Sequence, residues 1–162
     1  MTHILERISA ILARVTGWAV VALAVVLVVS LAASIFFRYV MGRALSWPEE
    51  VSLMIFAWLT LLSGSLGVRE GFHVRLTIVS DRLPELAGLW LQRLVLSAIA
   101  GFGVVLVFSG YDLIERTAEH LTPTLRLPLD LVNWSAPVCG ALVAVHALAR
   151  LGSARQRGEV QP

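Results

Sequence analysis

Of the 162 residues of this chain, 57% are hydrophobic and 15% are charged, whereas a soluble domain has about 45–50% and about 25%. The composition excludes a soluble helical bundle, because a 17.6 kDa protein has no core large enough to bury helices that are apolar on all sides. The net charge of +2 is small, and we expect the lipid bilayer, not nucleic acid, as a partner.

Four long apolar runs predict four membrane-spanning helices. A bilayer core is about 30 Å thick and a helix rises about 1.5 Å per residue, so a span needs about 20 apolar residues. The apolar runs themselves, residues 15–37, 51–68, 94–111 and 131–149, contain no Asp, Glu, Lys or Arg. We therefore expect an all-α integral membrane bundle of four transmembrane helices, in a single membrane domain over residues 1–162. The expected helices cover residues 15–37, 48–68, 91–111 and 131–150.

The first run has some features of a signal peptide. Ser30, Leu31 and Ala32 imitate a cleavage site. However, the run is longer than the roughly 7–15 apolar residues of a signal peptide and continues through Phe37. We therefore expect it to be an uncleaved spanning helix.

Charged and aromatic residues mark the ends of the first two helices. Ser46 and Glu49 have the spacing of a capping box, in which each side chain bonds to the other's backbone. Arg38 either extends its guanidinium into water or forms an ion pair, with Glu50 or with a partner protein. The expected helix-end or intersubunit contacts are Arg38, Trp47, Glu49, Glu50, Arg69 and His73.

Residues 72–86 mix apolar and charged side chains between the second and third helices. This pattern predicts a short interfacial segment lying on the cytoplasmic face of the membrane. Pro84 breaks the segment near its end, and Pro123 and Pro128 stiffen the loop before the last helix.

The distribution of arginine predicts the orientation in the membrane. All thirteen basic residues are Arg, and nine of them lie on the cytoplasmic side if both termini face the cytoplasm. Because cytoplasmic loops carry an excess of Lys and Arg, we expect the N-in, C-in orientation. The flanks of the first helix carry two Arg each, so the prediction depends on the second loop and the tail.

Small residues recur at helical spacing in three of the helices. In lipid, helices associate by close van der Waals approach at such residues. The stripes either pack the four helices together or leave one face for another protein, and the sequence alone leaves both possibilities open. The stripes are Ala57, Thr60, Ser63, Gly64 and Gly67 in the second helix, Ser97 and Gly101 in the third, and Ala136, Gly140 and Ala144 in the fourth.

The sequence shows no catalytic, phosphate-binding or metal-binding motif, so we expect neither enzymatic activity nor a cofactor. His146 is the only histidine inside an apolar run, whereas a haem held by two histidines needs them on facing helices. We expect His146 and the single Cys139 to be packing residues. Charged residues and helix breaks mark transport sites at mid-membrane, and their absence from these runs indicates that the chain has no substrate site of its own.

Several short motifs together resemble one transporter family. In chain order they are Arg38-Tyr39, Ser46-Trp47-Pro48-Glu49-Glu50, Gly67-Val68-Arg69-Glu70-Gly71-Phe72-His73-Val74, Asp81-Arg82-Leu83-Pro84 and Thr122-Pro123-Thr124-Leu125-Arg126-Leu127-Pro128, with Pro137 in the last helix. From about Leu5 to Leu151, the chain is similar to the small, four-helix Q-type membrane subunit of tripartite ATP-independent periplasmic (TRAP) transporters. It departs from the family at residues 129–134, where an aromatic cluster is frequent.

The resemblance implies a multi-pass scaffold subunit of the bacterial inner (plasma) membrane. Its implied partners are a large polytopic permease subunit, which carries the substrate and sodium sites, and a periplasmic solute-binding protein that captures an organic acid. Two alternatives stay open. A membrane-anchor subunit of a respiratory or redox complex would need haem or quinone ligands, and a free-standing small exporter would need to work without a partner.

Overall fold

The computed structural model of the protein describes residues 2–43, 45–70 and 85–159, and these residues form four long helices and one short helix. The long helices are α1 (Thr2–Tyr39), α2 (Trp47–Glu70), α4 (Glu85–Thr117) and α6 (Ser135–Glu159), and α5 (Asp130–Asn133) directly precedes α6. Four segments are long and apolar enough to cross a membrane. The prediction of an all-helical protein with four candidate spans is confirmed, and the N-in, C-in orientation stays a prediction.

All four long helices extend beyond the expected bounds, and α1 and α4 begin well before the residues expected. α1 begins at Thr2, because the residues before its apolar run include no proline or glycine that would end the helix. Two of these residues, Ser9 and Ala13, are also buried against the rest of the protein. α4 begins at Glu85, so the last two residues of the expected interfacial segment 72–86 belong to a long helix. Residues 72–84 of that segment lie outside the described residues.

The last span is interrupted between α5 and α6, where a single helix was expected. Pro137 has no backbone N–H, so it cannot donate the helical hydrogen bond to the carbonyl of Asn133. Trp134, which joins the two helices, keeps helical backbone angles (φ −59°, ψ −20°). The interruption is therefore a local break in hydrogen bonding within a nearly continuous span.

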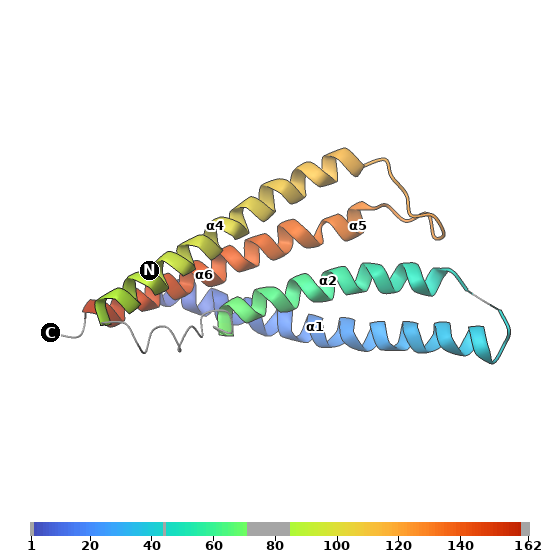
Figure 1. Ribbon diagram of the computed structural model, residues 1–162, viewed down its shortest axis with the longest axis horizontal. Helices are drawn as coiled ribbons and strands as arrows, with labels where there is room; N and C mark the ends of the chain where they lie inside the picture. The colour runs from blue at the N-terminus through green and yellow to red at the C-terminus, as the bar shows by residue number, and fades with distance from the viewer. Residues whose placement is uncertain (1, 44, 71–84, 160–162) are drawn as a thin grey trace.

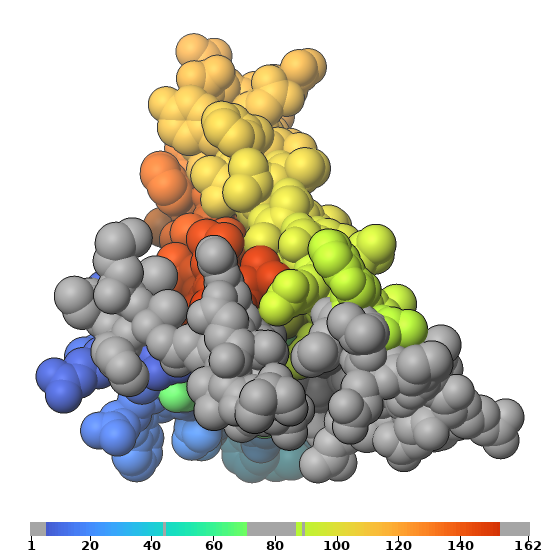
Figure 2. Space-filling model, turned by 90° about the vertical axis from the view of Figure 1, so that its left-hand side faces the viewer, coloured from blue at the N-terminus to red at the C-terminus, as the bar shows by residue number. Residues whose placement is uncertain are grey.

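The helices form two antiparallel hairpins, α1–α2 and α4–α6, and α6 also contacts α1 and α2. Figure 1 shows that the hairpins converge at the end that holds both termini, here called the terminal end. They spread apart toward the end that holds the loops 40–46 and 118–129, here called the loop end. Seen from the terminal end, α6 (orange-red) lies between α1 (blue) and α4 (yellow) (Figure 2).

Glycines bring the backbones of α4 and α6 into direct contact. A Cβ atom added to Gly103 would lie 2.7 Å from the carbonyl oxygen of Gly140, and one added to Gly140 would lie 2.6 Å from that of Gly103. Two turns further along α4, a Cβ added to Gly110 would lie 2.6 Å from Cδ of Pro137. The small residues of the fourth helix therefore pack within the chain.

Most of the small residues named for the second and third helices face outward, which is one of the two possibilities that the sequence left open. Thr60, Ser63 and Gly64 of α2 are exposed, and so are Ser97 and Gly101 of α4. A Cβ added to Gly64 or Gly101 would meet no atom within 4 Å. The contact surface of α4 thus uses the glycines at 103 and 110, on a different side of the helix from Gly101.

Candidate functional site

The charged residues at the loop end join the two helices of the first hairpin. Arg38 at the end of α1 forms an ion pair with Glu49 in the first turn of α2. Of the alternatives left open for Arg38, pairing with Glu50 is not the one that the structure shows, because the carboxylate of the neighbouring Glu49 binds the guanidinium. The side chains of Arg38 and Glu49 are 48% and 59% exposed, so this pair contributes little to stability. The Ser46–Glu49 capping box stays a prediction.

Glu50 instead reaches across to the second hairpin. Its Oε2 atom accepts hydrogen bonds from the backbone N–H groups of Thr124 and Leu125, at 3.2 and 3.0 Å. These residues belong to the loop between α4 and α5, which lies next to the start of α2 in Figure 1. Glu50 therefore ties the two hairpins together at the end where they spread apart.

The loop that Glu50 holds is itself a closed turn. The backbone N–H of Thr122 donates to the carbonyl of Leu127 (2.8 Å), and the N–H of Leu127 donates to the Thr122 hydroxyl (2.9 Å). Arg126 lies within the turn at φ 51°, in the left-handed region, which is uncommon for a residue other than glycine. Its side chain is exposed. The turn is thus fixed by bonds on both sides of a strained residue.

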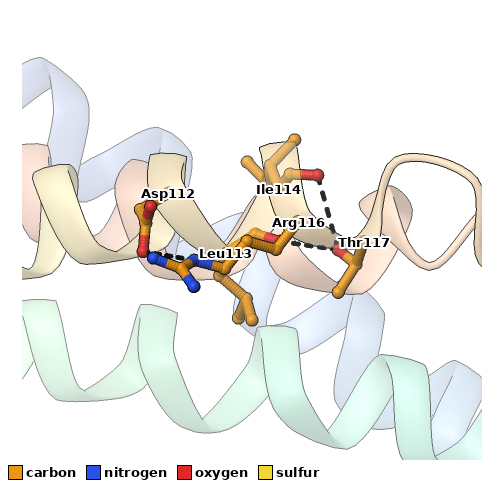
Figure 3. A network of polar contacts seen from close by, with 5 residues as sticks. All are labelled: Asp112, Leu113, Ile114, Arg116 and Thr117. Atoms are coloured by element: carbon orange, nitrogen blue, oxygen red, sulfur yellow. Dashed lines mark hydrogen bonds and ion pairs between the residues drawn. The ribbon is translucent and has the colours of Figure 1, made fainter.

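A polar network lies at the end of α4 (Figure 3), and one further hydrogen bond connects this helix to α5. The Nε atom of Arg116 donates to the carboxylate of Asp112 at 2.9 Å, one turn earlier. The Thr117 hydroxyl donates to the carbonyl of Leu113 at 2.7 Å and accepts a bond from the Asn133 amide, also at 2.7 Å. The Asn133–Thr117 bond fixes α5 against the end of α4.

Hydrogen bonds between α2 and the last span hold the two hairpins together inside the apolar region. The indole N–H of Trp58 donates to the carbonyl of Leu131 at 2.7 Å, and the thiol of Cys139 donates to that of Leu61 at 2.9 Å. Nearer the terminal end, Arg150 donates to the carbonyl of Val68 at 3.0 Å. A polar group in lipid must find a partner within the protein, and here the partners are helix carbonyls.

His146 connects α6 to α1 through a buried hydrogen bond. The His146 side chain is fully buried, and its Nδ1 atom lies 2.8 Å from the hydroxyl of Ser9, which is also buried. Nε2 is buried without a hydrogen-bond partner. The expectation that His146 is a packing residue agrees with this geometry, whereas its bond to Ser9 was not expected.

The other expected contact residues do not gather at one place. Trp47 begins α2 at the loop end, and Arg69 lies in the last turn of the same helix. Both side chains are exposed. His73 lies outside the described residues. Intersubunit roles for these residues stay predictions.

The polar residues that hold the hairpins together were not predicted, although the sequence contains a signal for them. Trp58 and Ser9 each place a hydrogen-bonding group in or beside an apolar run, and such groups require partners. The partners were not predictable, because most are backbone carbonyls. Among the described residues, no group of His, Cys, Asp or Glu could hold a metal ion. The arrangement therefore serves to hold helices together, with no reactive constellation in the described part of the chain.

Comparison with known families decides the identity. Residues 27–157 match the family described as "Tripartite ATP-independent periplasmic transporters, DctQ component". The chain belongs to this family. Members of the DctQ family are small permease subunits of TRAP transporters, so the chain is a transport protein and not an enzyme. The resemblance noted from the sequence motifs is thereby confirmed.

Curated relatives differ in the solutes that their names state. The chain is 28% identical over 115 residues to the sialic acid TRAP transporter small permease protein SiaQ of Vibrio cholerae. The aligned residues cover 70% of this chain and 66% of SiaQ. It is 29% identical over 114 residues to the C4-dicarboxylate TRAP transporter small permease protein DctQ of Rhodobacter capsulatus, covering 66% of this chain but only 48% of that protein.

A third relative is a much longer protein. The isethionate TRAP transporter permease protein DctMQ of Oleidesulfovibrio alaskensis is 27% identical over 109 residues, which are 66% of this chain and 17% of that protein. Its name joins the Q component with a second component. A small DctQ-like segment can therefore form part of a larger permease.

Proposed function

We propose that this DctQ-family chain is the scaffold subunit of a tripartite secondary transporter that imports an organic acid. A large polytopic permease subunit carries the substrate and ion sites, and a periplasmic solute-binding protein delivers the solute. The relatives named for sialic acid, C4-dicarboxylate and isethionate support an acidic solute, and DctMQ supports the association with a large subunit. We place the chain in the bacterial inner membrane with both termini in the cytoplasm.

One observation carries the scaffold role. Inside the spans, polar side chains such as Trp58, Cys139 and Arg150 are bonded to carbonyls of neighbouring segments. They are thus engaged in holding helices, whereas a transport site needs polar groups directed at a solute. The family assignment also argues against the two alternatives, a redox anchor and a free-standing exporter.

Co-purification tests this proposal directly. An affinity-tagged chain, expressed with its own neighbouring genes and extracted in mild detergent, should elute with a much larger membrane protein in constant ratio. A tagged, unrelated protein with four spans serves as the control for non-specific association in detergent micelles. Elution of the tagged chain by itself, from membranes that contain the candidate large subunit, would refute the scaffold role.

A further inference from the structure

The terminal half of α1 has two sides of different character. Ser9, Ala13 and Thr16 are buried against the rest of the bundle. The opposite side faces outward, and its residues follow one another at spacings of four, three and four, which places them in one line along the helix. This outward line consists of Arg7, Ile11, Arg14 and Trp18, all exposed.

Two exposed aromatic residues indicate the depth of this line in a membrane. Trp18 is 73% exposed and Tyr39 is 79% exposed, and such rings prefer the boundary between lipid and water. At about 1.5 Å per residue, the helix between them is about 32 Å long, close to the thickness of a bilayer core. Arg14 lies one turn beyond Trp18, about 6 Å along the axis, and therefore reaches the layer of lipid headgroups.

Some arginines of the chain have a counter-ion within the described residues and others do not. At the loop end, Arg38 and Arg116 are each paired with a carboxylate of the chain. Within the described residues, no hydrogen bond or ion pair engages the guanidinium of Arg7 or Arg14. Glu6 is next to Arg7 in sequence, but adjacent residues of a helix point in different directions. These two guanidinium groups therefore have no counter-ion within the described part of the protein. The headgroups of the membrane can supply one.

We propose that Arg7 and Arg14 bind the phosphate group of an anionic phospholipid. A guanidinium presents a planar fork of donors that suits phosphate oxygens. The long side chain of Arg14 brings its charged group to the headgroup layer, and Arg7, about 10 Å further along the helix axis, adds its charge from the water side of that layer. The acyl chains of the lipid lie along the exposed apolar side chains further down α1, including Val21 and Val25. The site depends only on the presence of the chain in a membrane, and not on the proposed transport function.

Native mass spectrometry of the full-length chain tests this site. The protein, in mild detergent, is titrated with phosphatidylglycerol and, separately, with phosphatidylcholine of the same acyl chains. We expect tighter binding of phosphatidylglycerol to the wild type, and an affinity about tenfold lower in the Arg7→Gln/Arg14→Gln variant. The matched control is Arg43→Gln/Arg126→Gln, which removes the same charge from two exposed arginines of the loop end and should change the affinity less than twofold.

Three results would overturn the proposal. They are equal affinity of the wild type for the two lipids, equal losses in the two double variants, and displacement of the lipid by millimolar inorganic phosphate, which would indicate a site for a free anion. If Arg7→Gln/Arg14→Gln fails to elute like the wild type, Arg7→Lys/Arg14→Lys replaces it. This variant keeps the positive charge but lacks the planar fork of the guanidinium, and we expect its affinity for phosphatidylglycerol to be about threefold lower than that of the wild type. An unchanged affinity would count against the bidentate site.

Discussion

At the residue scale, Glu49 and Glu50 are neighbours in the first turn of α2 with different tasks. Glu49 pairs with a half-exposed arginine of its own hairpin, whereas Glu50 accepts two backbone hydrogen bonds from the loop of the other hairpin. Bonds from backbone N–H groups to a carboxylate are stronger than an exposed ion pair. Glu50 is therefore the residue whose loss separates the loop from α2.

We predict that Glu50→Gln lowers the melting temperature of the purified chain in detergent by a few degrees, because the neutral amide is a weaker acceptor. Glu49→Gln and Arg38→Ala, which remove the two partners of one exposed pair, should each lower it by no more than about 1 °C. Intrinsic fluorescence during heating provides the measurement. Similar shifts for Glu49→Gln and Glu50→Gln would show that the loop bonds contribute nothing beyond surface charge.

The Ser9–His146 contact gives a second prediction at this scale. Ser9→Ala leaves Nδ1 of the fully buried His146 without its partner, and we expect a loss of about 0.5–1.5 kcal/mol in the free energy of unfolding, the usual range for such bonds between membrane helices. The double variant Ser9→Ala/His146→Leu removes both polar groups and should lose less than the sum of the single variants. Unfolding in denaturing detergent measures the free energies of the wild type, the two single variants and the double variant. Strict additivity of the losses in the single variants would mean that the two side chains do not interact.

At the scale of the helices, the contact between α4 and α6 depends on glycine. Gly140→Ala would place a methyl group 2.6 Å from a backbone oxygen of α4, so the helices must move apart, at a cost of about 1–3 kcal/mol. Gly101→Ala is the matched control on α4, because a Cβ there meets nothing within 4 Å and alanine favours the helix. We expect the melting temperature of the isolated chain to fall for Gly140→Ala and to stay the same or rise for Gly101→Ala. A fall of equal size in both variants would refute the packing described here.

The sequence predicted the existence of the helices better than their contacts. Apolar length alone fixes four spans, because lipid requires continuous helices. It does not fix which small residues face a neighbour: Gly101 and Gly103 both fit a packing stripe by composition, and only Gly103 meets α6. The pairing of Arg38 with Glu49, in place of Glu50, depends on the angle at which α1 and α2 meet, which the short loop does not specify.

At the scale of the whole molecule, both termini lie at one end of the bundle and the loops 40–46 and 118–129 at the other. The arginine distribution predicts that the terminal end faces the cytoplasm. In a Cys139→Ser background, a cysteine introduced at Thr124 should react with a membrane-impermeant thiol reagent in intact cells, and one at Thr2 should react only after lysis. Labelling of the Thr2→Cys variant in intact cells would reverse the orientation.

Uptake by reconstituted vesicles tests the central claim most directly, that the chain is a scaffold subunit without a transport site of its own. Vesicles holding the large subunit together with this chain, supplied with the solute-loaded binding protein and an inward sodium gradient, should accumulate a radiolabelled organic acid. Vesicles holding either membrane subunit alone should accumulate no more than protein-free vesicles. Uptake of the acid by vesicles that contain only this chain would contradict the account.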